Sequence, residues 1–200
     1  MEFVQPIRDP KKIEAMKKVL KSTSLRDYCL FVLGINSGLR ISDLLSLSIS
    51  DVMNGNKIKD RISIREQKTR KRNKEGQVIK EGKVKDFPLG DTSRKALKEY
   101  LDSRGEVEPD DPLFASRKGE KAITRQRVWT ILNETAKTVG IDENIGTHTL
   151  RKTFAYQAYK QGADISRIQD LLNHSSQKVT LRYMGITQDE KDDIYLNLNL

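Results

Sequence analysis

The sequence has very few of the residues from which disulfide-linked or zinc-binding domains are built. It contains one cysteine, Cys29, and two histidines in 200 residues. A single cysteine cannot form an internal disulfide, and Cys29 stands in the apolar run YCLFVLGI, where we expect it to pack as a small hydrophobic side chain. Zinc sites of the usual Cys/His type are excluded for want of ligands, and we expect neither a metal nor another cofactor. This cysteine usage indicates an intracellular, reducing setting, and we expect the cytoplasm.

Long apolar runs are also missing. No segment approaches the length needed to cross a bilayer, so we expect no membrane-spanning helix. The first ten residues, MEFVQPIRDP, lack the basic flank and the apolar block of a secretory signal. We find no internal repeat and no low-complexity linker, and the length is that of one domain.

What the sequence has in excess is positive charge. Lys and Arg number 37 against 28 Asp and Glu, which leaves a net charge of +9, while 36% hydrophobic residues suffice for a core. This balance favours a polyanionic partner, either nucleic acid or an anionic membrane surface. A basic protein without such a partner has the same composition, so charge alone does not decide between them.

Helical patterns occupy most of the chain outside its middle. Asp9 before Pro10 marks the start of one helix, and Ser24 with Asp27 forms a capping box for a second, which ends at Gly38. A short amphipathic helix and six longer ones are expected at 39–52, 93–104, 124–140, 150–162, 164–174, 178–185 and 189–198.

The middle of the chain predicts a β-hairpin. Residues 61–69 alternate apolar and polar side chains, with Ile62 and Ile64 on one face, and 83–89 can form a second strand. From Lys68 to Lys85 there are eight Lys or Arg residues and two Glu, so the connection is strongly basic. The alternative is that this basic connection is a solvated loop that binds no partner. The fold class is therefore mainly α with a small antiparallel β-sheet (α+β).

Six polar residues stand beside breaks in these elements, where hydrogen-bond donors converge on anions. Each has an ordinary structural explanation when taken alone; an arginine, for example, can pair with an aspartate three residues on, as Arg40 can with Asp43. Both histidines of the chain fall in the set, which favours a joint role. The six are Arg40, Lys68, His148, Arg151, His174 and Tyr183.

Four segments carry these residues: SGLRISDLL, EQKTRK, THTLRKTFA and LLNHSSQKVTLRYMG. In order and spacing they resemble the tyrosine recombinases of the integrase family, whose set is Arg, Lys, His-x-x-Arg, His or Trp, and Tyr. The similarity runs from about Gly34 to Tyr183, most of the chain. It implies the catalytic-domain fold of DNA breaking-rejoining enzymes and site-specific recombination of double-stranded DNA, so that DNA, and not a membrane, is the expected partner.

The resemblance also implies how a phosphodiester would be held without a metal. Fixed cations must face the nonbridging oxygens where negative charge develops. Arginine suits this task because its planar fork stays charged and binds two oxygens at once. Arg40 and Arg151 would form the clamp, and His174 would add a hydrogen bond to the same phosphate.

The phenolic oxygen of Tyr183 would then be the nucleophile. A phenol has a pKa of about 10, so it needs cations or a base nearby, and His148 is the family candidate for exchanging its proton. Lys68 would protonate the leaving 5′ oxygen as general acid. The product would be a 3′-phosphotyrosine link and a free 5′ hydroxyl, and no ATP would be needed for rejoining.

Contacts to the DNA backbone are expected from the basic connection and from the helix TRQRVWTILNETAK. The candidates are Arg70, Lys71, Arg72, Arg125 and Arg127, and affinity should fall steeply with salt. Trp129 of the same helix is a core or a groove-facing aromatic.

Arg40 comes so early that the N-terminal core-binding domain of most family members does not fit before it. The sequence is therefore either an isolated catalytic half or a naturally short recombinase. We expect a catalytic domain over 1–186 and a C-terminal tail over 187–200, helix or strand, either exchanged between protomers of a tetramer on paired DNA sites or folded onto its own domain. The alternative to the tetramer is a monomer when DNA is absent. The alternatives to recombination are a catalytically silent DNA-binding assembly module and a type IB topoisomerase-like activity.

Overall fold

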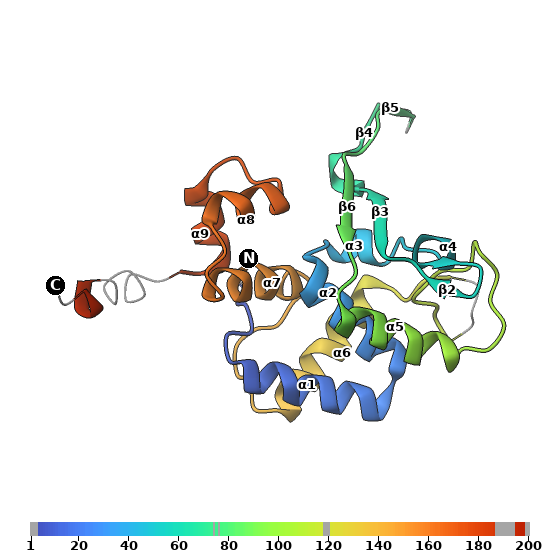
Figure 1. Ribbon diagram of the computed structural model, residues 1–200, viewed down its shortest axis with the longest axis horizontal. Coiled ribbons are helices and arrows are strands. Elements are labelled where there is room, and N and C mark those ends of the chain that lie inside the picture. Colours follow the sequence, from blue (N-terminus) through green and yellow to red (C-terminus); the bar gives the residue numbers. More distant parts are fainter. Residues whose placement is uncertain (1–3, 74, 76, 118–120, 187–194, 199–200) are drawn as a thin grey trace.

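The computed structural model of the chain describes residues 4–73, 75, 77–117, 121–186 and 195–198. It is mainly helical, with short antiparallel strand pairs on one side (Figure 1). The helices are α1 Pro10–Thr23, α2 Leu25–Ser37, α3 Ile41–Leu44, α4 Ile49–Val52, α5 Asp91–Asp102, α6 Arg125–Thr138, α7 Thr149–Lys160, α8 Ile165–Leu172 and α9 Gln177–Met184. The strands are β1 Met53–Asn54, β2 Lys57–Ile58, β3 Arg61–Arg65, β4 Lys71–Arg72, β5 Val78–Lys80 and β6 Val84–Pro88, with a 3-10 turn at Gln67–Thr69.

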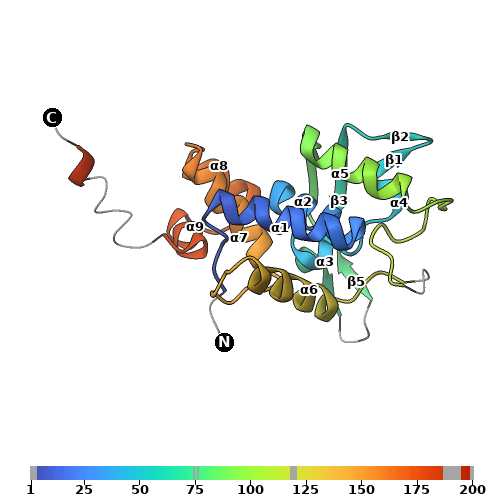
Figure 2. The same cartoon turned by 90° about the horizontal axis from the view of Figure 1, so that it is seen from below.

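Helix α2 is the centre of the domain. It contacts α1, α5 and α7, and both views show these helices around it (Figures 1 and 2). Every side chain from Tyr28 to Leu33 is buried, including the thiol-bearing Cys29. A helix that is apolar on all sides must be covered on all sides, and this fixes where the other helices pack.

The predicted helix ends around α2 are confirmed. The Asp9 side chain accepts the backbone N–H of Lys11 at the start of α1, and the Ser24 side chain accepts that of Asp27 at the start of α2. Gly38 ends α2 in the left-handed conformation, with φ of 59°. These local interactions satisfy donors and acceptors that a helix leaves open at its ends.

The predicted hairpin is formed by β3 and β6, which pair antiparallel with Ile62 opposite Phe87 and Ile64 opposite Lys85. The first strand is shorter than the sequence predicted, because the chain turns into the 3-10 helix at Gln67–Thr69. Two further strand pairs were not predicted: β4 with β5 inside the basic connection, and β1 with β2.

The prediction of a single amphipathic helix over 39–52 is wrong. The structure has two one-turn helices there, α3 and α4. Serine side chains compete for the backbone in this segment: the Ser46 hydroxyl donates to the Asp43 carbonyl, and Ser48 caps α4 in a capping box with Asp51. The Ile49 N–H is bound by the carbonyl of Asp111 from a distant loop, so tertiary contacts complete the break.

Helices α7, α8 and α9 enclose a second, smaller core of Ala155, Ile168, Leu172 and Met184. Figure 1 shows α8 and α9 on the side of α7 opposite to α5. Most of the helix expected over 189–198 lies outside the described residues, although 195–197 are helical. Within the described ranges, no helix has both the length and the apolar composition to cross a membrane.

Candidate active site

Close packing of α2 against α7 brings two of the predicted arginines together. A Cβ on Gly34 would stand 2.6 Å from a methyl carbon of Leu150, and one on Gly38 would stand 2.4 Å from the ring of Phe154. Larger side chains at either glycine would push the helices apart. The contact places Arg151, on α7, beside the end of α2 that leads into Arg40.

Arg151 is buried, with 2% of its surface exposed, and its guanidinium joins two helix ends. Nη1 donates to the Gly38 carbonyl at 2.5 Å, and Nη2 donates to the Leu172 carbonyl, at the end of α8, at 2.6 Å. Burial lowers the pKa of Arg151, and the nearby charge of Arg40 lowers it further. The fork is therefore held rigidly, and its fixed charge is available to an anion at the surface of this cluster.

Arg40 stands at the N-cap of α3 and pairs with two carboxylates. Its Nη1 lies 2.7 Å from Oε1 of Glu66 and 3.9 Å from Oδ2 of Asp43, and both carboxylates have fully buried side chains. Arg40 therefore does pair with Asp43, as its spacing in the sequence allowed, but Glu66 is the nearer partner. Burial raises the pKa of Asp43, and a hydrogen bond from the Gln67 N–H and the charge of Arg40 oppose that rise.

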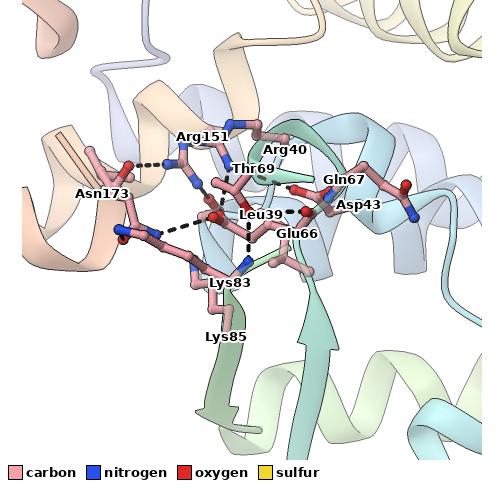
Figure 3. Close-up of polar contacts among 12 residues, drawn as sticks. Leu39, Arg40, Asp43, Glu66, Gln67, Thr69, Lys83, Lys85, Arg151 and Asn173 are labelled. Atoms are coloured by element: carbon pink, nitrogen blue, oxygen red, sulfur yellow. Dashed lines mark hydrogen bonds and ion pairs between the residues drawn. The ribbon is translucent and has the colours of Figure 1, made fainter. Parts of the chain in front are cut away.

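Glu66 also connects this cluster to the turn that carries His174. Its Oε2 accepts a hydrogen bond from Nδ2 of Asn173 at 3.2 Å, and Lys83 Nζ donates to Oδ1 of Asn173 at 3.3 Å (Figure 3). Asn173 ends α8 and adopts the left-handed conformation, with φ of 51°, which asparagine tolerates better than most residues.

A buried lysine lies beneath the arginines. Lys85 of β6 is 9% exposed, and its Nζ donates to the Ser37 carbonyl at 3.0 Å. Burial lowers the pKa of Lys85 to about 8, and the neighbouring Arg151 contributes to that shift. Lys85 and Arg151 therefore bind successive carbonyls at the end of α2, Ser37 and Gly38.

His174 and Tyr183 contact each other directly. Their rings meet edge to face, with centroids 4.9 Å apart, and His174 Nδ1 lies 3.1 Å from Oγ1 of Thr180. Burial lowers the pKa of His174 to about 4, and the charges of Arg151 and Arg40 lower it further, so the imidazole is neutral at neutral pH.

The Tyr183 hydroxyl is buried next to Arg151. Among the described residues, no group lies in good hydrogen-bonding geometry to this hydroxyl. Burial raises the pKa of Tyr183, while the positive charges of Arg151 and Arg40 act in the opposite direction. Lys152 Nζ lies 5.2 Å from the centre of the Tyr183 ring, on the same helix as Arg151. The phenol therefore lies among cations that favour its ionised form.

His148 and Lys68 lie at the exposed edge of the same cluster. His148 is the N-cap of α7, and Lys68 lies in the 3-10 turn at the end of β3. Loss of hydration lowers the pKa of His148, and the charges of Arg125 and Lys68 lower it further. The charge of Lys68 also acts on His174, so all six predicted residues surround one site.

The predicted DNA-binding residues of α6 differ in their distance from this site. Arg125 Nε donates to Oγ1 of Thr147 at 3.2 Å, next to His148, whereas Arg127 lines a separate hollow between α1, α5 and α6. Trp129 is 45% exposed and lines a hollow with Arg125 and Thr147, so it is a surface aromatic and not a core residue.

The remaining three predicted DNA-binding residues are on the hairpin connection. Arg70 pairs with Glu81 at 3.2 Å, while Lys71 and Arg72 form strand β4. Their contacts with DNA remain predictions.

Two charged residues of the cluster were missed by the sequence analysis, although the strand pattern contained a signal. Ile62, Ile64 and Glu66 follow the two-residue period of buried positions, and Lys85 continues the buried stripe of Phe87. A carboxylate and an ammonium at inward-facing positions of paired strands need partners inside the protein. The inward face of the hairpin thus supplies Glu66, which holds Arg40, and Lys85, which binds the Ser37 carbonyl at the end of α2.

The fold and the clustered side chains define the class of protein. The structure is similar to the crystal structure of XerA recombinase, with a TM-score of 0.74 over 98% of this chain and 64% of that chain, at 23% sequence identity. The mainly helical fold with small antiparallel sheets is that of the catalytic domains of tyrosine recombinases, which confirms the predicted fold class.

Sequence comparison identifies the family. The profile of the phage integrase family matches residues 8–190, so the chain belongs to this family, as its motifs predicted. It is 40% identical over 189 residues to the probable integrase/recombinase YoeC of Bacillus subtilis (strain 168), covering 94% of this chain and 93% of that protein. It is 33% identical over 175 residues to tyrosine recombinase XerC of Pelobacter propionicus, covering 86% of this chain and 51% of XerC, about half of its length.

Proposed function

We propose that the chain carries out site-specific cleavage and rejoining of double-stranded DNA through a covalent bond to Tyr183. The observation that carries the proposal is the position of the buried Tyr183 hydroxyl beside Arg151 and the edge-to-face contact of its ring with His174. A phosphate bound by the arginines would thus lie next to the nucleophile. Membership of the phage integrase family supports the same reaction.

In the cleavage step, the Tyr183 oxygen attacks phosphorus and loses its proton, while the bond from phosphorus to the 5′ oxygen breaks. The proton of Tyr183 passes to His148, whose lowered pKa leaves it neutral and able to accept. The 5′ oxygen takes a proton from Lys68 and leaves as a hydroxyl. A 5′ hydroxyl from another strand then attacks the phosphotyrosine, which restores a phosphodiester and releases Tyr183.

Arg40 and Arg151 stabilise the negative charge that builds up on the nonbridging oxygens. An arginine has five N–H donors, so the bonds of Arg151 to the Gly38 and Leu172 carbonyls leave donors for a phosphate. Preorganised donors of this kind contribute about 3 to 4 kcal/mol each when charge develops in a shielded site. His174 adds a further hydrogen bond on the side of Tyr183.

DNA binding extends beyond the reacting phosphate. Arg70, Lys71, Arg72, Arg125 and Arg127 contact the backbone on both sides of the cleavage point, which accounts for the excess of positive charge. Because its substrate is DNA, the enzyme acts in the cytoplasm. Residues 1–186 form the catalytic domain, and the tail over 187–200 joins protomers into a tetramer on paired sites.

A pool of nicked duplexes with a randomised binding site tests this function. The nick lets the short 3′-side fragment diffuse away after cleavage, which traps the phosphotyrosine. We expect a protein–DNA band that survives denaturation, is lost after protease treatment and is absent with Tyr183→Phe. DNA retained without any adduct would identify a silent binding module. Relaxation of supercoiled plasmid without recombinant products would identify a topoisomerase-like activity.

A further inference from the structure

Glu66 is a buried carboxylate at the edge of a site that we propose holds a phosphate. A negative charge there opposes the binding of an anion, so its presence needs a compensating benefit. The side chain of Glu66 has no exposed surface, and its two oxygens are used separately. Oε1 binds Arg40 at 2.7 Å, and Oε2 binds the amide of Asn173 at 3.2 Å. One carboxylate thus joins the start of α3 to the end of α8.

The end of α8 is held at two successive residues. The carbonyl of Leu172 accepts from Arg151, and the side chain of Asn173 lies between Glu66 and Lys83 (Figure 3). The next residue is His174. Asn173 is also the one non-glycine residue with positive φ among the described residues. Glycine would meet the backbone requirement of this turn at least as well, so the amide side chain has a second role.

The hairpin base completes the connection. The Glu66 N–H donates to the Lys83 carbonyl, and the Lys83 N–H donates to Oγ1 of Thr69, so Glu66 and Lys83 lie side by side across the two arms. A Cβ on Gly82 would stand 2.2 Å from the carbonyl oxygen of Glu66, so the arms approach too closely for a larger residue there. The hairpin therefore presents Glu66 and Lys83 together to Asn173.

We propose that Glu66 and Asn173 are positioning residues that fix Arg40 relative to the turn carrying His174, so that both face the same phosphate. The inference deepens the proposed function and rests on it. Neither residue touches the reacting atoms in this scheme. Their hydrogen bond acts through Arg40 on one side and His174 on the other, and it sets the spacing between two groups that come from elements far apart in the sequence.

An exchange of donor and acceptor tests this link. Glu66→Gln alone makes two amide NH2 groups face each other where an oxygen accepted before, and Asn173→Asp alone places two carboxylates together. With both substitutions, the amide and the carboxylate change places, the hydrogen bond between them is restored, and the oxygen facing Arg40 is kept. Aspartate also tolerates the left-handed conformation.

The readouts are the single-turnover rate of adduct formation on the nicked duplex selected above and the affinity for the same DNA. We expect each single variant to cleave at least about 10-fold more slowly, since small misplacements of reacting groups have effects up to about 100-fold. DNA affinity should change by less than about 3-fold, because most backbone contacts remain. The double variant should recover to within about 3-fold of the wild-type rate. A double variant no faster than the slower single variant overturns the proposal.

Two further variants separate positioning from folding. Asn173→Gly keeps the backbone conformation and removes the amide, so it should show the same loss of rate while still unfolding in one cooperative urea transition; a wild-type rate overturns the proposal. Glu106→Gln and Asn54→Asp make the same chemical changes at exposed positions and should leave the rate unchanged.

The same double-variant cycle in urea unfolding measures the Glu66–Asn173 contact without DNA, and additive effects there overturn the link. If the wild-type chain forms no adduct while this cycle shows coupling, the proposed function fails, and the positioning role fails with it although the contact stands.

Discussion

The imidazole of His174 meets the ring of Tyr183 edge to face, at an interplanar angle of 74°. Such pairs are favourable because the positive edge of one ring faces the negative face of the other. His174 is in turn fixed near Thr180, three residues before Tyr183 on α9. The proposed nucleophile and the histidine therefore form one unit, and displacement of either changes the position of the other.

Replacing Tyr183 by Phe should abolish the covalent adduct and preserve DNA binding. The ring contacts with His174 and Lys152 remain in this variant, and only the buried hydroxyl is removed. Because this hydroxyl lacks a hydrogen bond of good geometry, we expect the free energy of unfolding to stay the same or rise by about 1 kcal/mol. Denaturing gels and urea unfolding measure the two effects. A persistent adduct would show that another residue is the nucleophile.

Arg151→Lys should impair both cleavage and folding. Lysine keeps the charge but cannot bind the Gly38 and Leu172 carbonyls with one planar fork. We expect the cleavage barrier to rise by about 2 kcal/mol or more, and the free energy of unfolding to fall by about 1 to 3 kcal/mol through the buried carbonyl left unpaired. Cleavage rates at saturating DNA and urea unfolding give the two values. Near-normal cleavage would contradict the clamp.

Stability should depend on pH through His174. Its pKa is about 4 in the folded protein, against about 6.5 in an unfolded chain, so the unfolded state binds more protons between these values. The folded state is therefore most stable above pH 6.5 and loses on the order of 3 kcal/mol as the pH falls from 6.5 through 4. Urea unfolding at pH 7 and pH 4 should show this loss, and His174→Gln should remove that part of it. An identical loss in both proteins would contradict the assignment.

Lys68→Ala should be rescued by a better leaving group. If Lys68 protonates the 5′ oxygen, a bridging 5′ sulfur, which leaves without a proton, should restore cleavage by the variant. The wild-type enzyme should gain little from the same substrate. The measurement is the ratio of cleavage rates on the sulfur and oxygen substrates. An unchanged ratio would point to Lys71 or another lysine of the hairpin as the acid.

DNA affinity should fall steeply as salt rises, because phosphate contacts release bound counterions. Arg125→Ala and Arg127→Ala should each lower the slope of log affinity against log salt by about 1, with similar effects on all DNA sequences. Titrations with a fluorescent duplex at several salt concentrations measure the slopes. Matched changes at the exposed Lys57 and Lys95, on β2 and α5, serve as controls. A flat dependence for the unmodified chain would argue against backbone binding.

Local features of this chain were predictable because they depend on neighbours a few residues away. The caps at Asp9, Ser24 and Gly38 and the left-handed turn at Asn173 each follow from one residue's own chemistry. The alternation of Ile62 and Ile64 likewise predicted the strand, since it reflects one buried face. The order and spacing of the motif residues were sufficient to predict the family.

The partners of the charged groups could not be predicted in this way. Glu66 meets Arg40 and Asn173 across 26 and 107 positions of the sequence, and Arg151 meets Gly38 across 113. The break of 39–52 into two short helices also needed a distant partner, the carbonyl of Asp111. Short-range patterns specify which face of an element is buried, whereas the pairing of buried charges depends on how α2, α7, α8 and the hairpin pack, since a buried charge is stable only beside the partner that this packing supplies.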